Sequence, residues 1–321
     1  MIDSHAHLRD WCQSHKETIE HACRVCERQG IHGIFDMAAN SDPPVITRDI
    51  FRLSVLKAEQ YPSQVYHGVF LGLTYEPPQI EETARCVEEY SFDNAVNNGK
   101  RSFAAGLKLF AGTTFSGSSF KKLNVTETSQ QRIVFETLSK IKYRGVVDVH
   151  CEKDFLMHTK LWNPKNPITH SYARPEESET TSIEEVAKIA HETGFDGRLH
   201  IVHITTPGSV EIVDNYRKLI NISCAVTPWH LLLNNEMMNQ PNGICLKVNP
   251  PVRSPKTREG LFNYFKRDLI DVLESDHAPH SYEEKTGGLG KDGKSQYFSG
   301  IPCLPWWQFL VDKLMRKGIK K

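Results

Sequence analysis

Short apolar runs alternate with helix-like stretches along the chain, and this alternation limits the possible fold more than any other feature. Eight runs rich in β-branched and aromatic residues are predicted strands: Met1–His5, Ile31–Met37, Val65–Leu71, Phe103–Phe110, Gly145–Val149, Arg198–Val202, Ile222–Val226 and Leu269–Leu273. The predicted helices are Lys16–Gln29, Thr47–Gln60, Ile80–Asn98, Ser129–Lys142, Ser182–Thr193, Pro207–Leu219, Thr257–Phe265 and Pro305–Arg316. Alternating strands and helices form parallel sheets, and eight such units in 321 residues predict a (β/α)8 barrel.

An open, doubly wound sheet is the alternative architecture, but no GxGxxG or P-loop pattern directly follows a predicted strand and opens a predicted helix. We interpret residues 1–321 as a single catalytic barrel domain, because no linker or repeat divides them. Two long segments, Cys151–Ser182 and His277–Pro302, follow predicted strands. Both are therefore expected to lie over the carboxyl-terminal face of the barrel, where they could act as lids.

The composition is that of a cytoplasmic globular protein. Lys and Arg number 39, as do Asp and Glu, so the net charge gives no reason to expect nucleic acid or an anionic membrane as partner. The chain contains neither a membrane-length apolar run nor a signal-peptide pattern. Eight cysteines in a chain of this length are expected to be reduced thiols, and Cys23 and Cys26 are predicted to pack within a helix. The expected partner is a small molecule.

Polar side chains stand where the predicted strands end, and these ends share one face of a barrel. They are His5, His7 and Arg9 after the first strand, Asn40 after the second, Lys108 within the fourth, His150 and His203 at the fifth and sixth, and Asp276 and His280 after the eighth. Two histidines in a His-x-His pair point to the same side of a strand and can hold one metal ion. His200 competes with His203, but His203 is nearer the strand end and is the preferred ligand.

The motifs at these positions resemble the amidohydrolase superfamily and, within it, the dihydroorotases, over roughly residues 1–305. The matching motifs are Asp-x-His-x-His-Leu-Arg at Asp3–Arg9, Met-x-x-Asn…Pro-Pro-Val at Met37–Val45, Lys-Leu-Phe at Lys108–Phe110, His-Ile-Thr-Thr at His203–Thr206, Thr-Pro-x-His-Leu at Thr227–Leu231, Asn-Pro-Pro-x-Arg at Asn249–Arg253, Asp-His-Ala-Pro-His at Asp276–His280 and Gly-x-Pro at Gly300–Pro302. Arg9 favours the dihydroorotases over the hydantoinases. Hydantoinases act on similar rings that have no carboxylate, and these enzymes generally lack the arginine.

The resemblance implies a zinc-dependent, reversible cyclisation of N-carbamoyl-L-aspartate to L-dihydroorotate in pyrimidine biosynthesis. It implies two zinc ions, one held by His5, His7 and Asp276 and the other by His150 and His203. Lys108 would be carboxylated and would bridge the two ions. Asp276 would also be the general acid and base, and the substrate carboxylate would be bound by Arg9, Asn40 and His280.

Two other functions remain open at this stage. The chain could be another cyclic amidase, such as a hydantoinase, dihydropyrimidinase or allantoinase. It could also be a non-catalytic dihydroorotase-like subunit, although such subunits typically lose metal ligands and all six positions are filled here. The longer dihydroorotases carry a small β-sandwich, which this sequence is predicted to lack. A homodimer is expected, as is association with other enzymes of the pathway.

Overall fold

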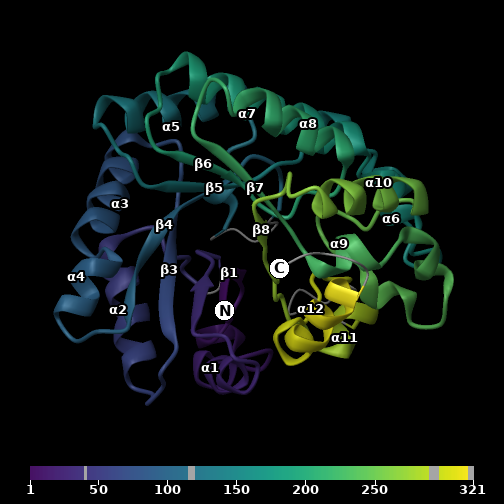
Figure 1. Ribbon diagram of the computed structural model, residues 1–321, viewed down its shortest axis with the longest axis horizontal. Helices are drawn as coiled ribbons and strands as arrows, with labels where there is room; N and C mark the ends of the chain where they lie inside the picture. The colour runs from purple at the N-terminus through teal and green to yellow at the C-terminus, as the bar shows by residue number, and fades with distance from the viewer. Residues whose placement is uncertain (40–41, 115–119, 289–295, 317–321) are drawn as a thin grey trace.

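Eight parallel strands form one sheet whose order follows the chain from β1 to β8 (Figure 1). The computed structural model describes residues 1–39, 42–114, 120–288 and 296–316. The strands are β1 (Ile2–Ala6), β2 (Gly33–Asp36), β3 (Tyr66–Gly72), β4 (Ser102–Phe110), β5 (Val146–His150), β6 (Arg198–Ile201), β7 (Ile222–Val226) and β8 (Val272–Leu273). Every adjacent pair is parallel, which confirms the predicted (β/α)8 barrel.

The barrel closes between its first and last strands at the carboxyl-terminal end. Ala6 and His277 form a parallel bridge there, and the backbone N–H of His7 donates to the carbonyl of His277 over 2.7 Å. The same His277 forms a second parallel bridge with Ile301. Since β8 has only two residues, backbone contacts from the polar segment that follows it help to close the barrel.

The helices lie outside the sheet (Figure 1). Those of the repeating units are α1 (Ile19–Arg28), α2 (Arg48–Glu59), α3 (Pro77–Glu89), α4 (Phe92–Asn97), α5 (Thr128–Lys140), α7 (Glu176–Glu192), α8 (Pro207–Tyr216), α10 (Pro255–Lys266) and α12 (Trp307–Arg316). Shorter pieces are α6 (Thr169–Ala173), α9 (Pro228–Leu232), α11 (Tyr282–Thr286), and the 3₁₀ turns η1 (Trp11–Gln13), η2 (Lys121–Leu123), η3 (Asp154–Leu156), η4 (Thr159–Leu161), η5 (Asn235–Asn239), η6 (Gly243–Leu246) and η7 (Leu304–Trp306).

Most predicted elements agree with the structure to within about three residues at each end, and three agree with it less well. The helix predicted over Ile80–Asn98 is two helices, because Ser91 interrupts the first and its side chain caps the second at the N–H of Asn94. The predicted strand Leu269–Leu273 is ordered as a strand only at its end. α7 begins six residues before its predicted start at Ser182, where Pro175 and an acidic first turn favour a helix N-terminus.

Strand alternation separates an apolar outer layer from a polar barrel interior. Leu107, Leu109, Val147 and Val149 are fully buried in the large hydrophobic cluster shared with the surrounding helices. Lys108, which lies between two of these residues on β4, is also fully buried but belongs to the opposite side of the strand. Polar side chains such as Lys108 thus face the barrel interior near its carboxyl-terminal end, and apolar side chains pack in the outer layer.

An irregularity in β4 sets the direction in which Lys108 points. Val69 pairs with Ala104 but Phe70 pairs with Gly106, so one residue of β4 has no partner on β3. A Cβ atom on Gly106 would lie 2.9 Å from the carbonyl oxygen of Val146 and the same distance from the ring of Phe70. Glycine is therefore required where the strand bulges.

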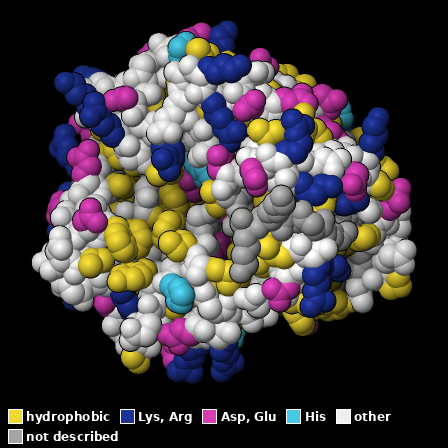
Figure 2. Space-filling view, in the orientation of Figure 1, with side chains coloured by type: hydrophobic (Ala, Val, Ile, Leu, Met, Phe, Trp, Pro, Cys, Tyr) yellow, Lys and Arg dark blue, Asp and Glu magenta, His cyan; other side chains and the backbone are white. Residues whose placement is uncertain are grey.

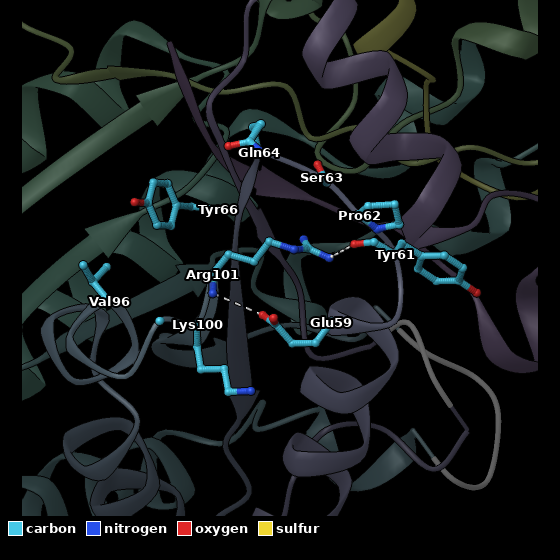
Figure 3. Close-up of a pocket in the computed structure, with 10 residues that line it drawn as sticks. Glu59, Tyr61, Pro62, Ser63, Gln64, Tyr66, Val96, Lys100 and Arg101 are labelled. Atoms are coloured by element: carbon cyan, nitrogen blue, oxygen red, sulfur yellow. Dashed lines mark hydrogen bonds between the residues drawn. The ribbon is translucent and has the colours of Figure 1, made fainter.

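The opposite, amino-terminal face holds a cavity of about 440 Å³ between the starts of β3 and β4 (Figure 3). Arg101 crosses its wall and donates to the carbonyl oxygens of Tyr61, over 2.8 Å, and Val65, over 3.3 Å. Glu59 accepts from the backbone N–H groups of Arg101 and Ser102. The charged groups of Arg101 and Glu59 are thus hydrogen-bonded to backbone groups around the cavity.

Positive and negative side chains are mixed over the face seen in Figure 2, as equal numbers of the two charge types would suggest. Among the helices that the structure describes, none combines the length and apolar character needed to cross a membrane.

Candidate metal and carboxylate site

His5, His7 and Asp276 meet where β1 and β8 end. The Nε2 atoms of His5 and His7 lie 3.6 Å and 3.4 Å from Oδ1 of Asp276, and the three ligand atoms all lie within 4.8 Å of one another. Asp276 adopts a left-handed backbone conformation, with φ of 42°, a strained geometry that is found most often at functional sites. Burial acts to raise the pKa of Asp276, but the hydrogen bond from His7 and the nearby His5 outweigh it and lower the pKa.

These separations fit one metal ion. Nitrogen and oxygen ligands about 2.0–2.1 Å from a tetrahedral zinc ion lie roughly 3.3–3.4 Å from each other. Burial lowers the pKa of His5 well below its usual value, so its imidazole is neutral, which is the form that binds metals. The donor set of two imidazoles and one carboxylate suits zinc.

His150 and His203 form a second pair beside the first. Nδ1 of His150 lies 3.2 Å from Nε2 of His203, again close to the separation of two ligands on one ion. The ring centroids of His5 and His203 are 5.3 Å apart, so the two groups are neighbours. His203 has φ of 37°, and this turn beyond the end of β6 carries its side chain to His150. His200 instead hydrogen-bonds to Ser223 on β7 over 2.7 Å.

A buried carboxylate supports His150 from behind. Nε2 of His150 lies 3.0 Å from Glu152, which itself accepts two hydrogen bonds from Arg174, of 2.8 Å and 2.6 Å. Burial acts to raise the pKa of Glu152, but Arg174 and His150 hold it well below its usual value. An ionised Glu152 accepts a hydrogen bond from the Nε2–H group of His150, which leaves Nδ1 unprotonated and able to coordinate a metal.

Lys108 is fully buried, and its Nζ atom has no hydrogen-bond partner among the residues that the structure describes. Burial lowers the pKa of this amine, although the charges of Asp148, Glu274 and Asp276 oppose the change. A lysine with no partner in this environment is costly as a cation and is favoured as a neutral amine. Lys108 therefore has the chemistry required of a nucleophilic amine beside the two histidine groups.

Sequence reasoning missed three carboxylates of the site: Asp148, Glu152 and Glu274. Burial raises the pKa of Glu274 to about 7, and its Oε1 accepts from the backbone N–H of His203 over 2.7 Å and lies 3.5 Å from Nδ1 of His5. All three stand two residues from a predicted ligand, and residues two apart share one side of a strand. That spacing was the signal that could have identified them.

Arg9 and His280 lie together at the edge of this site. Nη2 of Arg9 is 3.1 Å from Nε2 of His280, and Nε of Arg9 is buried without a hydrogen-bond partner among the residues that the structure describes. Burial lowers the pKa of Arg9 to about 10 and that of His280 to about 3. A guanidinium with an unused donor can bind a carboxylate through two hydrogen bonds. Asn40, the third residue predicted to bind the substrate carboxylate, lies outside the described residues.

Other motif residues have structural roles. His230 is held between Thr227, at 2.9 Å, and the carbonyl oxygen of Pro250, at 3.1 Å. Arg253 is buried and donates to Thr205 over 2.7 Å and to Glu179 over 3.3 Å. These contacts connect the segments that follow β6 and β7 to each other and to helix α7. Cys23 and Cys26 are buried free thiols on α1, in line with helix packing.

The chain is similar to proteins named dihydroorotase over most of its length, whereas no protein-family model matches it. It is 29% identical over 309 residues to a dihydroorotase of Thermococcus kodakarensis, covering 95% of this chain and 59% of that protein. It is 28% identical to a dihydroorotase of Methanothermobacter thermautotrophicus, covering 99% of this chain and 64% of that protein. The chain thus spans about three fifths of these relatives, and the resemblance predicted from its motifs is confirmed.

Solved structures with the same fold include an L-hydantoinase from Arthrobacter aurescens. Its TM-score is 0.80 at 20% identity, covering 99% of this chain and 66% of the hydantoinase. A D-hydantoinase from a Thermus species has a TM-score of 0.77 at 19% identity, covering 99% of this chain and 65% of that one. At these identities the likeness bears on the fold alone.

Proposed function

We propose that this chain is a dihydroorotase, which interconverts L-dihydroorotate and N-carbamoyl-L-aspartate at the carboxyl-terminal face of the barrel. The observation that carries the proposal is the position of the Arg9–His280 pair beside the cluster of His5, His7 and Asp276. A cation with an unused donor, next to ligands for a metal, fits a cyclic amide that bears a carboxylate. The names of the curated relatives support the same reaction.

His5, His7 and Asp276 would hold one metal ion, and His150 and His203 would hold the second. Two divalent ions, zinc by the donor set, would supply a Lewis acid for the ring carbonyl and an attacking water of lowered pKa. Lys108 would join the two groups if its neutral amine formed an N–C bond with CO₂ and lost one proton. Such a carbamate would offer two anionic oxygens as metal ligands, which fits an amine that is buried without a partner among the described residues.

Asp276 moves the proton. Its carboxylate has a lowered pKa and is therefore ionised, so it can accept a proton from the attacking water. It then delivers that proton to the ring nitrogen as the amide C–N bond breaks. His7, whose Nε2 lies 3.4 Å away, orients the carboxylate. Arg9 binds the substrate carboxylate through its guanidinium fork and His280 assists it, which fixes the ring amide over the metal ligands.

The test is hydrolysis of L-dihydroorotate by the purified, metal-loaded protein, followed by the ultraviolet absorbance of the ring amide. We expect turnover that chelation abolishes and that zinc restores. Dihydrouracil and hydantoin, which lack the carboxylate, serve as control substrates. Turnover of either control without turnover of L-dihydroorotate would replace the proposal with a hydantoinase-type activity.

A further inference from the structure

Described residues contact both nitrogens of the His280 ring and stack on its face. Its Nε2 faces Nη2 of Arg9 at 3.1 Å. Its Nδ1 faces two groups at once, Nζ of Lys16 at 3.3 Å and Oε2 of Glu284 at 3.4 Å. The ring stacks on Phe298 with centroids 4.8 Å apart and planes 16° apart. One ring nitrogen therefore lies between a donor and an acceptor.

Both groups at Nδ1 are fixed in place. Oε2 of Glu284 accepts from the backbone N–H of Ser281 over 3.1 Å, as part of the capping box of α11. Its other oxygen, Oε1, lies 3.2 Å from Nζ of Lys16 and 3.4 Å from His15. The Lys16 side chain is only 6% exposed, and its Nζ lies 4.7 Å from the centre of the Phe298 ring. Neither group can leave Nδ1 without breaking these contacts.

Arg9 determines which nitrogen of His280 carries the proton in this arrangement. A guanidinium has donors and no acceptor, so Nε2 must accept from Arg9. The neutral ring then carries its proton on Nδ1 and donates it to Glu284. Burial favours the neutral ring.

A bound substrate carboxylate reverses this requirement, because it can only accept hydrogen bonds. Nε2 must then carry a proton, either by protonation of the ring or by a shift of its single proton from Nδ1. After such a shift the bare Nδ1 would face the carboxylate of Glu284, and two acceptors repel each other. Lys16, on the same nitrogen, supplies the donor that makes the shifted form acceptable.

Resting on the proposed function, we propose that Lys16 and Glu284 act together on Nδ1 of His280 as a two-way switch. The switch lets the His280 ring change from hydrogen-bond acceptor to hydrogen-bond donor at Nε2 when the substrate carboxylate binds, and the ring takes up no proton in doing so. Lys16 is a positioning residue in this scheme, since it acts through His280. The charged groups that face the ring are Arg9 after β1, Lys16 before α1 and Glu284 on α11.

The switch makes carboxylate binding independent of proton uptake by His280. Without a donor at position 16, His280 could donate to a carboxylate only as an imidazolium paired with Glu284. Binding would then require a proton, and the dissociation constant would rise with pH by up to about tenfold per unit. Lys16→Met removes the donor, whereas Lys16→Gln keeps one in its side-chain amide.

The experiment measures binding of orotate, a ring carboxylate, to the metal-loaded protein by titration calorimetry between about pH 6 and pH 8. The readout is the dissociation constant of each variant divided by that of the wild type at the same pH, because this ratio cancels titrations common to both proteins. We expect the ratio to rise with pH by up to about tenfold per unit for Lys16→Met, and to stay constant for Lys16→Gln. Lys160→Met on η4 is the matched control, since it removes an exposed lysine near the same face.

A ratio for Lys16→Met that does not change with pH would overturn the switch while leaving the proposed function intact. A rising ratio for Lys16→Gln would also overturn it, because the donor would then not be what matters. Should Lys16→Met fail to fold, Lys16→Ala with the same readout decides between these results. A wild-type protein that neither binds orotate nor hydrolyses L-dihydroorotate would overturn the proposed function and the switch together.

Discussion

Polar side chains at the two ends of the barrel can be compared by whether their hydrogen-bonding groups have partners. At the carboxyl-terminal face, Nζ of Lys108 and Nδ1 of His203 are buried without hydrogen-bond partners among the described residues. At the amino-terminal face, the charged groups of Arg101 and Glu59 bond to the wall of their own cavity (Figure 3). Unused bonding capacity is costly in an interior, and it is retained where a ligand completes it. The contrast between these particular groups agrees with the candidate site at the carboxyl-terminal end, whereas the cavity lies at the other end.

The largest expected effect follows from Lys108→Ala at the carboxyl-terminal face. This variant removes the bridge, so we expect one metal ion in place of two and loss of turnover. Metal analysis and the L-dihydroorotate assay measure the two results. Short carboxylic acids, which can occupy the space of the missing carbamate, should restore part of the activity. Two metal ions in the unrescued variant would contradict the bridging role.

Asp276→Asn separates proton transfer from metal binding. The amide oxygen can still coordinate a metal, but it cannot accept and deliver the proton. We expect kcat to fall by about 10²- to 10⁴-fold while the metal content is largely kept. The measurement pairs steady-state kinetics with metal analysis of the same sample. A variant that retains the wild-type kcat would remove Asp276 from proton transfer.

Arg9→Lys tests whether a planar fork is needed at the carboxylate. Lysine keeps the charge but loses the second parallel hydrogen bond, which is worth about 1.5–3 kcal/mol when the partner is charged. We expect kcat/KM for L-dihydroorotate to fall by roughly 10- to 100-fold, mainly through KM. If kcat fell instead and KM stayed constant, Arg9 would act on the reacting atoms rather than on binding.

Arg101→Met sharpens the comparison from the other face. It removes donors to backbone carbonyls at the amino-terminal cavity, far from the candidate ligands in the barrel. We expect the free energy of unfolding to fall by about 1–3 kcal/mol with kcat/KM unchanged. Denaturant unfolding and the standard assay give the two numbers. A variant of normal stability and low activity would assign this cavity a function that its hydrogen bonds do not suggest.

The sequence predicts the barrel and its strand-end residues because both depend on local patterns. Apolar runs and helical periodicity predict the eight units, and His5, His7 and Asp276 follow from their places at strand ends. The bulge before Lys108 could not be predicted, because it results from the register between β3 and β4.

The supporting residues were harder to predict for a related reason. Arg174 reaches Glu152 from across a long segment, and Lys16 reaches His280 from the other end of the chain. Such partners are set by tertiary packing, which no local pattern reports.

The closing bridge between Ala6 and His277 has a consequence for the order of assembly. Ser275 hydrogen-bonds to the carbonyl of His5 across 270 residues of sequence, so the first candidate metal group spans almost the whole chain. A nascent chain therefore has no complete group of His5, His7 and Asp276 until its last strand has been made and has docked on its first. Metal capture by these residues thus requires the first and last strands to have docked, and a bound ion would stabilise a contact between residues about 270 positions apart.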